Sequence, residues 1–146
     1  MRKSVFLAHV KDAACQQGGT LPEYLKKTRE LGFEGLECDY PDLEQDPQGF
    51  AAMLQEADLQ IASVPYFCSF EKGVDAGKLR TVVEKTAAAG GKRILAIPGF
   101  LDEQYPDALE DMVKGLRILC EEAQKFGITV SLEDFDNQTS PCATGE

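Results

Sequence analysis

Basic residues are scarce in this sequence, and long apolar runs do not occur in it. Its 146 residues include 15 lysines and arginines against 25 aspartates and glutamates, which gives a net charge of −10. Nucleic-acid surfaces and anionic membranes are bound by clustered basic faces, so this balance argues against both partners. No stretch of about 18 apolar residues is present, and the sequence therefore predicts no membrane-spanning helix.

Paired cysteine motifs are also missing. The five cysteines include no C-x-x-C pair, and their odd number fits free thiols in a reducing compartment better than a disulfide framework. The basic start followed by a short apolar run superficially resembles a signal peptide, but His9 and Lys11 interrupt that run. We expect a cytoplasmic protein.

Short apolar runs alternate with segments of helical periodicity along the whole chain. The runs predict five strands, at residues 4–10, 35–40, 60–67, 92–98 and 128–135. Four helices are predicted between them, the clearest from a stripe made of Leu109, Met112, Val113, Leu116, Leu119, Cys120, Ala123 and Phe126. We interpret that stripe as core.

Helix-start and helix-stop signals agree with this alternation. Thr20 followed by Pro22 and Glu23 is typical of a helix start, and Gly32, Gly90-Gly91 and Gly127 each follow a predicted helix. Strand, helix and strand in strict order indicate parallel strands joined by right-handed crossovers. We predict one α/β domain over residues 1–146.

Two architectures use such units, the eight-stranded barrel and the open doubly wound sheet. A flavodoxin-like sheet would be complete with five strands, but residues 9–12 hold no glycine-rich loop after the first strand. Residues 136–146 form a polar tail where a fifth helix is expected to start. We therefore predict an incomplete barrel, namely the N-terminal five strands of a (βα)8 TIM barrel.

Functional side chains in such arrays gather at the carboxyl ends of the strands. The candidates are His9, Glu37, Asp39, Tyr66, Cys68, residues 98–100, Glu133, Asp134 and Asp136.

Glu133 is the most informative of these candidates. Alternation along the last strand places Val130 and Leu132 toward the helices and Ser131 and Glu133 on the other face. A carboxylate at that mouth can bind a divalent metal ion or transfer a proton, whereas a surface acid would cap the next loop or pair with a lysine.

The remaining candidates permit two interpretations each. Glu37 and Asp39 alternate with Leu36 and Cys38, so their carboxylates either face inward for a purpose or line a solvated loop mouth. His9, the only histidine, is a substrate contact or a hydrogen-bonded structural residue. Tyr66 and Phe67 wall a pocket or belong to the core, and Cys68 has no basic neighbour in sequence to make it a nucleophile.

Several of these segments resemble a known family. Residues 127–135, with the polar loop that follows, look like the fifth-strand segment of the xylose-isomerase-like barrel superfamily of sugar-phosphate isomerases and epimerases. Residues 31–37 and 60–64 are similar to the family's second and third strands, so the resemblance covers nearly the whole chain.

This resemblance implies a divalent metal (Mn, Mg, Co or Zn) held by two Glu, an Asp and a His at the barrel mouth. By position Glu133 would be the first metal ligand and a catalytic group in proton transfer next to a sugar carbonyl. His9, Glu37 and Tyr66 would contact the sugar. The other ligands would lie on later strands, so the complete site is expected only in a closed barrel, and whether the isolated chain is an enzyme stays open.

Two other functions remain. A non-catalytic half-barrel would expose sheet edges and an uncovered inner face, and would therefore associate with a second copy as a homo-oligomer. A complete flavodoxin-like domain would bind a small ligand, and a strand order of 2-1-3-4-5 would identify it.

Overall fold

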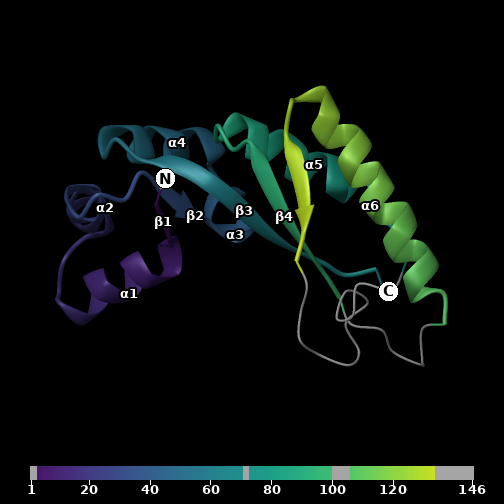
Figure 1. Ribbon diagram of the computed structural model, residues 1–146, viewed down its shortest axis with the longest axis horizontal. Coiled ribbons are helices and arrows are strands. Elements are labelled where there is room, and N and C mark those ends of the chain that lie inside the picture. Colours follow the sequence, from purple (N-terminus) through teal and green to yellow (C-terminus); the bar gives the residue numbers. More distant parts are fainter. Residues whose placement is uncertain (1–2, 71–72, 100–105, 134–146) are drawn as a thin grey trace.

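The structure is a computed structural model in which residues 3–70, 73–99 and 106–133 are described. These residues form five parallel strands and six helices (Figure 1). In chain order they are β1 (Ser4–Phe6), α1 (Leu7–Gln16), α2 (Leu21–Glu30), β2 (Gly35–Glu37), α3 (Tyr40–Leu43), α4 (Pro47–Glu56), β3 (Gln60–Cys68), α5 (Ala76–Ala88), β4 (Arg93–Pro98), α6 (Ala108–Lys125) and β5 (Thr129–Leu132).

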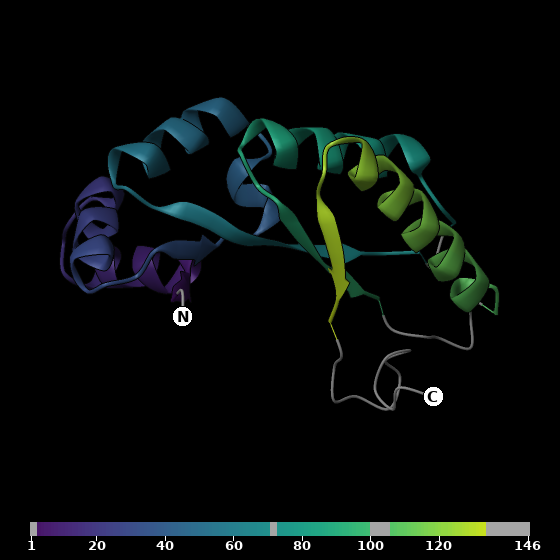
Figure 2. The same ribbon diagram turned by 45° about the horizontal axis from the view of Figure 1, so that its top comes forward.

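The sheet has the sequential strand order β1-β2-β3-β4-β5, with every neighbouring pair parallel. Sequential parallel order is the arrangement of a (βα)-barrel, and it excludes the flavodoxin-like alternative, which would have required 2-1-3-4-5. Helices α2, α4, α5 and α6 follow one another along the outside of the curved sheet (Figures 1 and 2). The prediction of a partial barrel is confirmed.

The main core lies between the sheet and these helices. Leu36, Val64 and Ile94 are completely buried on the helix side of three successive strands. Leu25, Val82 and Leu119 reach them from α2, α5 and α6 and are equally buried, so each crossover helix covers the strands that it connects.

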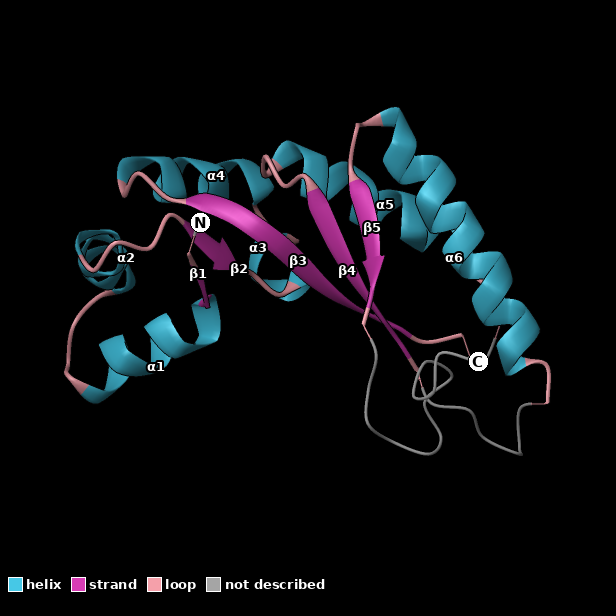
Figure 3. Ribbon diagram, viewed as in Figure 1, coloured by secondary structure: helices cyan, strands magenta, loops and turns pink. Residues whose placement is uncertain are grey.

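Three of the predicted strands end earlier than the apolar pattern suggested, the last of them at Leu132. The first stops at Phe6 and the chain turns at once into α1, because Leu7, Val10 and Ala14 bury a helical stripe that the apolar run concealed. The second stops at Glu37, and the short helix α3 begins soon after it at Tyr40, with Pro41 in its first turn. Both extra helices follow the carboxyl ends of their strands (Figure 3).

The helix boundaries follow the signals in the sequence. The Glu23 carboxylate accepts a hydrogen bond from the Thr20 backbone N–H at 2.8 Å, which closes the start of α2. Gly32, Gly90 and Gly127 have φ angles of +88°, +83° and +63°, the left-handed conformation predicted for helix stops. The tail at 136–146, where a further helix start was expected, lies outside the described residues.

The predicted core stripe of α6 is wrong in part. Met112, Leu119 and Ala123 are buried as expected, but Leu109 and Val113 are half exposed. The apolar stripe of α6 is therefore wider than the part of the helix that is buried against the described residues. No described helix is long and apolar enough to cross a membrane.

The Phe70 ring packs directly against the backbone of α6 at Gly115, and this contact provides a test of the packing. A Cβ atom at Gly115 would collide with the ring of Phe70, which is 5% exposed beyond the end of β3. We predict that Gly115→Ala destabilises the fold by about 1–3 kcal/mol by overpacking, although alanine favours helices. Urea denaturation measures this change.

Gly77→Ala in α5 is the matched control, because its Cβ would meet only Asp75 Oδ1 at 3.3 Å. Combining Gly115→Ala with Phe70→Leu should recover part of the loss. A Gly115→Ala protein as stable as the wild type would contradict the close packing of Phe70 against Gly115.

Burial of two thiols predicts a difference in cysteine reactivity. Burial raises the pKa of Cys38 and of Cys68 to about 12, whereas Cys15 and Cys120 are exposed. A pKa three units above the ordinary value leaves about a thousandfold less thiolate at pH 8. We therefore expect a disulfide reagent to label Cys15 and Cys120 within minutes and Cys38 and Cys68 only after unfolding, as peptide mass spectrometry will show. Fast labelling of Cys68 in the folded protein would contradict this placement.

Candidate functional site

The side of the sheet that faces away from the helices carries a line of polar groups centred on Glu37. One Glu37 carboxylate oxygen accepts a hydrogen bond from Ser4 Oγ on β1 at 3.1 Å, and the other accepts one from Ser63 Oγ on β3 at 3.3 Å. The pairing of β2 with β3 shifts register at this point, between Leu36 and Glu37. We call this side, with Ser4, Glu37 and Ser63 on it, the inner face.

Glu37 thus lies on the inner face, where both its carboxylate oxygens have serine partners. Its expected contact with a substrate stays a prediction. A sugar hydroxyl can still bind to the remaining lone pairs of this carboxylate. The sequence did not single out Ser4 and Ser63 as partners of the Glu37 carboxylate, although each serine lies on a predicted strand. The register of β1 with β2 and of β2 with β3 is what brings their hydroxyls to Glu37.

His9 lies on α1, three residues beyond the end of β1. Its exposed imidazole meets the Phe6 ring edge to face, with ring centres 5.6 Å apart. Phe6 pairs with Glu37 across β1 and β2, so the Phe6 and His9 rings lie at the carboxyl end of the first two strands. The two predicted candidates His9 and Glu37 are therefore brought to the same region.

Asp39 lies in the same region, exposed at the start of α3. Partial desolvation and the nearby Asp42 carboxylate raise its pKa, and the Lys11 ammonium opposes them. Lys11 on α1 forms an ion pair with Asp42 on α3. This ion pair joins α1 to α3 and neutralises the Asp42 carboxylate. The Asp39 carboxylate beside it stays exposed.

Tyr66 and Cys68 lie on the opposite side of β3, toward the helices. Tyr66 is buried and meets Tyr40 of α3 edge to face at 5.4 Å, and burial raises its pKa to about 12. Cys68 is buried beside it, and its raised pKa agrees with the expectation that it is no nucleophile. The substrate contact expected of Tyr66 stays a prediction, and the next residue, Phe67, is the one on the inner face.

Glu133 directly follows β5 and is half-buried. Its backbone N–H donates to the carbonyl of Ala96 at 3.0 Å, which continues the β4–β5 ladder in which Ala96 pairs with Leu132. Ala96 is fully buried on the helix side, so the alternation that sends Leu132 toward the helices turns Glu133 to the inner face. Leu132 itself is half exposed, because β5 is the edge strand of the described sheet.

A complete metal site is not formed by the residues that the structure describes. Among them, no group of three or more His, Cys, Asp or Glu side chains is arranged to hold a metal ion. Glu133 is a suitable oxygen donor, but its neighbours on β4 are apolar. The candidates Phe100, Asp134 and Asp136 lie outside the described residues.

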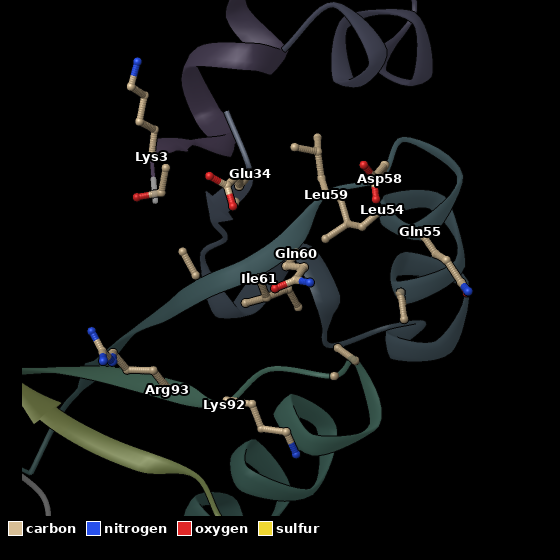
Figure 4. A pocket seen from close by; sticks show the side chains of 16 residues that line it. Lys3, Glu34, Leu54, Gln55, Asp58, Leu59, Gln60, Ile61, Lys92 and Arg93 are labelled. Carbon is tan, nitrogen blue, oxygen red and sulfur yellow. The ribbon is translucent and has the colours of Figure 1, made fainter. Parts of the chain in front are cut away.

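A cleft of about 800 Å³ opens at the opposite end of the sheet, at the amino ends of the strands (Figure 4). Lys3, Lys92 and Arg93 line it together with Glu34 and Gln60. The three basic side chains point in different directions in Figure 4 and do not converge on a common ligand position. In parallel βα arrays the chemistry lies at the carboxyl ends, so we assign the candidate site to the end with Glu37 and Glu133.

The match to a known family agrees with this geometry. Residues 25–146 match the family described as "Xylose isomerase-like TIM barrel". No curated protein matches the chain by sequence.

Solved structures show the same fold at low sequence identity. A sugar phosphate isomerase/epimerase from Parabacteroides distasonis superposes with a TM-score of 0.69 at 16% identity, over 90% of this chain and 50% of its own. The 3-keto-D-glucoside 4-epimerase of E. coli gives 0.64 at 20% identity, over 82% of this chain and 52% of its own. A protein named IolI, solved with a bound zinc atom, gives 0.62 at 16% identity, over 84% and 48%.

The chain thus spans about half the length of these structures. The family match covers most of the chain, and the sequential parallel sheet is that of the N-terminal strands of such a barrel. The chain belongs to the xylose isomerase-like TIM barrel family.

Proposed function

We propose that this chain supplies the N-terminal part of a divalent-metal-dependent isomerase or epimerase that acts on a sugar or a sugar phosphate. The observation that carries the proposal is the position of Glu133, a carboxylate at the carboxyl end of β5 on the inner face, in a chain of this family. Structures of a sugar phosphate isomerase/epimerase and of a sugar epimerase among the similar folds support the same class of substrate.

In this proposal Glu133 has two roles. It offers one carboxylate to a divalent ion, and it holds or transfers a proton at the carbon next to the substrate carbonyl. The ion, when bound, would polarise that carbonyl. The described residues form no group of three or more His, Cys, Asp or Glu side chains that could hold the ion, so the full reaction is proposed for the closed barrel.

The other inner-face residues would orient the sugar. The Glu37 carboxylate is fixed by two serine hydroxyls and can accept hydrogen bonds from sugar hydroxyls. The exposed His9 imidazole can donate or accept at the end of β1. Held side chains lower the cost of orienting a substrate, because less conformational freedom is lost on binding.

Paramagnetic metal binding tests the role of Glu133. We expect Mn²⁺ at millimolar concentration to broaden the backbone NMR signals of Glu133 and of its neighbour Ala96 before those of other residues. Glu133→Gln should abolish this local broadening while leaving the chemical shifts of the core unchanged. Glu84→Gln, which alters an exposed carboxylate of α5, is the matched control and should leave it intact. Equal broadening at all surface carboxylates, insensitive to Glu133→Gln, would argue against a metal site there.

A second function is favoured by exposed apolar side chains at one edge of the sheet. Leu109, Val113 and Leu132 are 51%, 42% and 50% exposed and lie on α6 and β5. Exposed parallel edges and apolar patches promote association. We propose that the isolated chain associates with a second copy through this edge.

Light scattering coupled to size exclusion tests this association. We expect an average mass above that of one 16.0 kDa chain, rising with concentration. Leu132→Lys should lower it toward the monomer, because a charge on an edge strand opposes pairing. Leu31→Lys is the control, since Leu31 is 76% exposed at the end of α2, away from that edge. A monomer at all concentrations would exclude the second function.

A further inference from the structure

The cleft at the amino ends of the strands, which we call the amino-end cleft, is lined by three exposed cations. These are Lys3, Lys92 and Arg93. None of the four ion pairs within residues 3–70, 73–99 and 106–133 includes any of the three. In a chain of net charge −10, such a group of unneutralised cations is an uneven distribution of charge that can attract an anionic ligand.

The acids of this cleft do not neutralise its cations. Asp58 lines the cleft, but it is bound to Arg29 of α2, with Arg29 Nε 2.9 Å from Asp58 Oδ2. Glu34, just before β2, is the other acid among the lining residues that the structure describes. At physiological ionic strength charges more than about 8 Å away are largely screened. The local excess of cations therefore decides which ligand the cleft attracts, rather than the net charge of the chain.

The cations are spread along the cleft instead of gathered at one point. Lys3 directly precedes β1, whereas Lys92 and Arg93 stand at the start of β4. Because β2 and β3 lie between those strands, the two cationic positions are three strand spacings or about 14 Å apart along the sheet. Figure 4 shows Gln60 and Ile61 of β3 between them. One phosphate group cannot contact both positions, since its oxygen atoms lie too close together.

The lining between the two cationic positions is small or apolar. Gly35 of β2 has no side chain, and a Cβ atom there would lie 3.1 Å from the Cβ of Ala62 on β3. Ile61 is partly buried, and the exposed Gln60 amide can donate and accept hydrogen bonds. This combination suits an extended peptide, whose backbone amides can bind Gln60 and whose aliphatic side chains can cover Ile61.

The length of an extended peptide also matches the separation of the cations. An extended chain rises about 3.3 Å per residue, so side chains four residues apart lie on the same side and about 13 Å from each other. Two acidic side chains at that spacing can reach Lys3 and the start of β4 together.

We propose that the amino-end cleft binds an extended acidic segment of a partner protein. Two carboxylates of the segment, about four residues apart, pair with Lys3 at one end and with Lys92 and Arg93 at the other, and Gln60 contacts the backbone between them. The cleft lies at the opposite end of the sheet from Glu133, so this inference goes beyond the proposed isomerase or epimerase function and does not depend on it.

Titration of the 146-residue chain with capped heptapeptides, followed in backbone NMR spectra, tests the inference. The probe carries glutamates at its second and sixth positions, leucine at its fourth and alanine elsewhere. We expect it to shift the signals of Lys3, Gln60 and Arg93. It should bind about threefold more tightly than an isomer with two adjacent glutamates, which reaches only one cationic position, and about tenfold more tightly than a peptide with glutamine in place of both glutamates.

Substitutions in the chain identify the cations that bind. Lys3→Gln and Arg93→Gln should each weaken binding of the spaced peptide about threefold, because each removes one exposed ion pair. Lys114→Gln is the matched control, since it removes the same charge from an exposed position of α6 outside the cleft. All three side chains are exposed, so the variants should fold, as their backbone spectra will show.

Four outcomes would overturn the inference. The first is no binding of the spaced peptide, and the second is equal binding of the spaced and adjacent peptides. The third is binding that is unchanged in both Lys3→Gln and Arg93→Gln, or weakened as much by Lys114→Gln. The fourth is an equal response of the same signals to inorganic phosphate, which would make the cleft a general anion site. None of these results changes the expected effect of Mn²⁺ at Glu133, so the proposed function is tested separately.

Discussion

Burial of the helix side of a parallel sheet is the constraint on which the rest of this structure depends. A parallel strand is reached only through a crossover, and the crossover helix must cover the apolar side of the strands that it joins. Leu36, Val64 and Ile94 are completely buried in this layer, and the crossover helices supply equally buried partners such as Leu25 and Val82. With one face committed to this packing, alternation leaves the other face free for polar and exposed side chains.

The inner face is organised by a single carboxylate. β1 and β2 contribute only three residues each, and Glu37 links both of its neighbouring strands through the hydroxyls of Ser4 and Ser63. The link coincides with the register shift between β2 and β3, which brings Ser63 rather than its predecessor opposite Glu37. Stability of the short strands and orientation of a candidate site residue therefore depend on the same two hydrogen bonds.

The two short helices give the carboxyl end of the sheet its chemical character. α1 and α3 follow β1 and β2 directly, and the ion pair of Lys11 with Asp42 joins them. This pairing neutralises a cation that could otherwise have attracted an anionic ligand. Among the described residues, the exposed groups at this end include acids, an imidazole and two phenyl rings.

The sequence by itself determined the alternation of five strands with four crossover helices and the partial-barrel class, because apolar periodicity and helix-stop glycines depend only on neighbours along the chain. It could not determine that residues 7–10 are helix, since one short apolar run suits a strand end and a helix start equally well. It could not place Tyr66 on Tyr40, or Ser4 and Ser63 on Glu37, because strand register and the burial of a ring arise from contacts between distant segments. Only the tertiary structure decided which side chains share a row of the sheet, because the row of Phe67, Ile97 and Glu133 follows from the register of β3, β4 and β5.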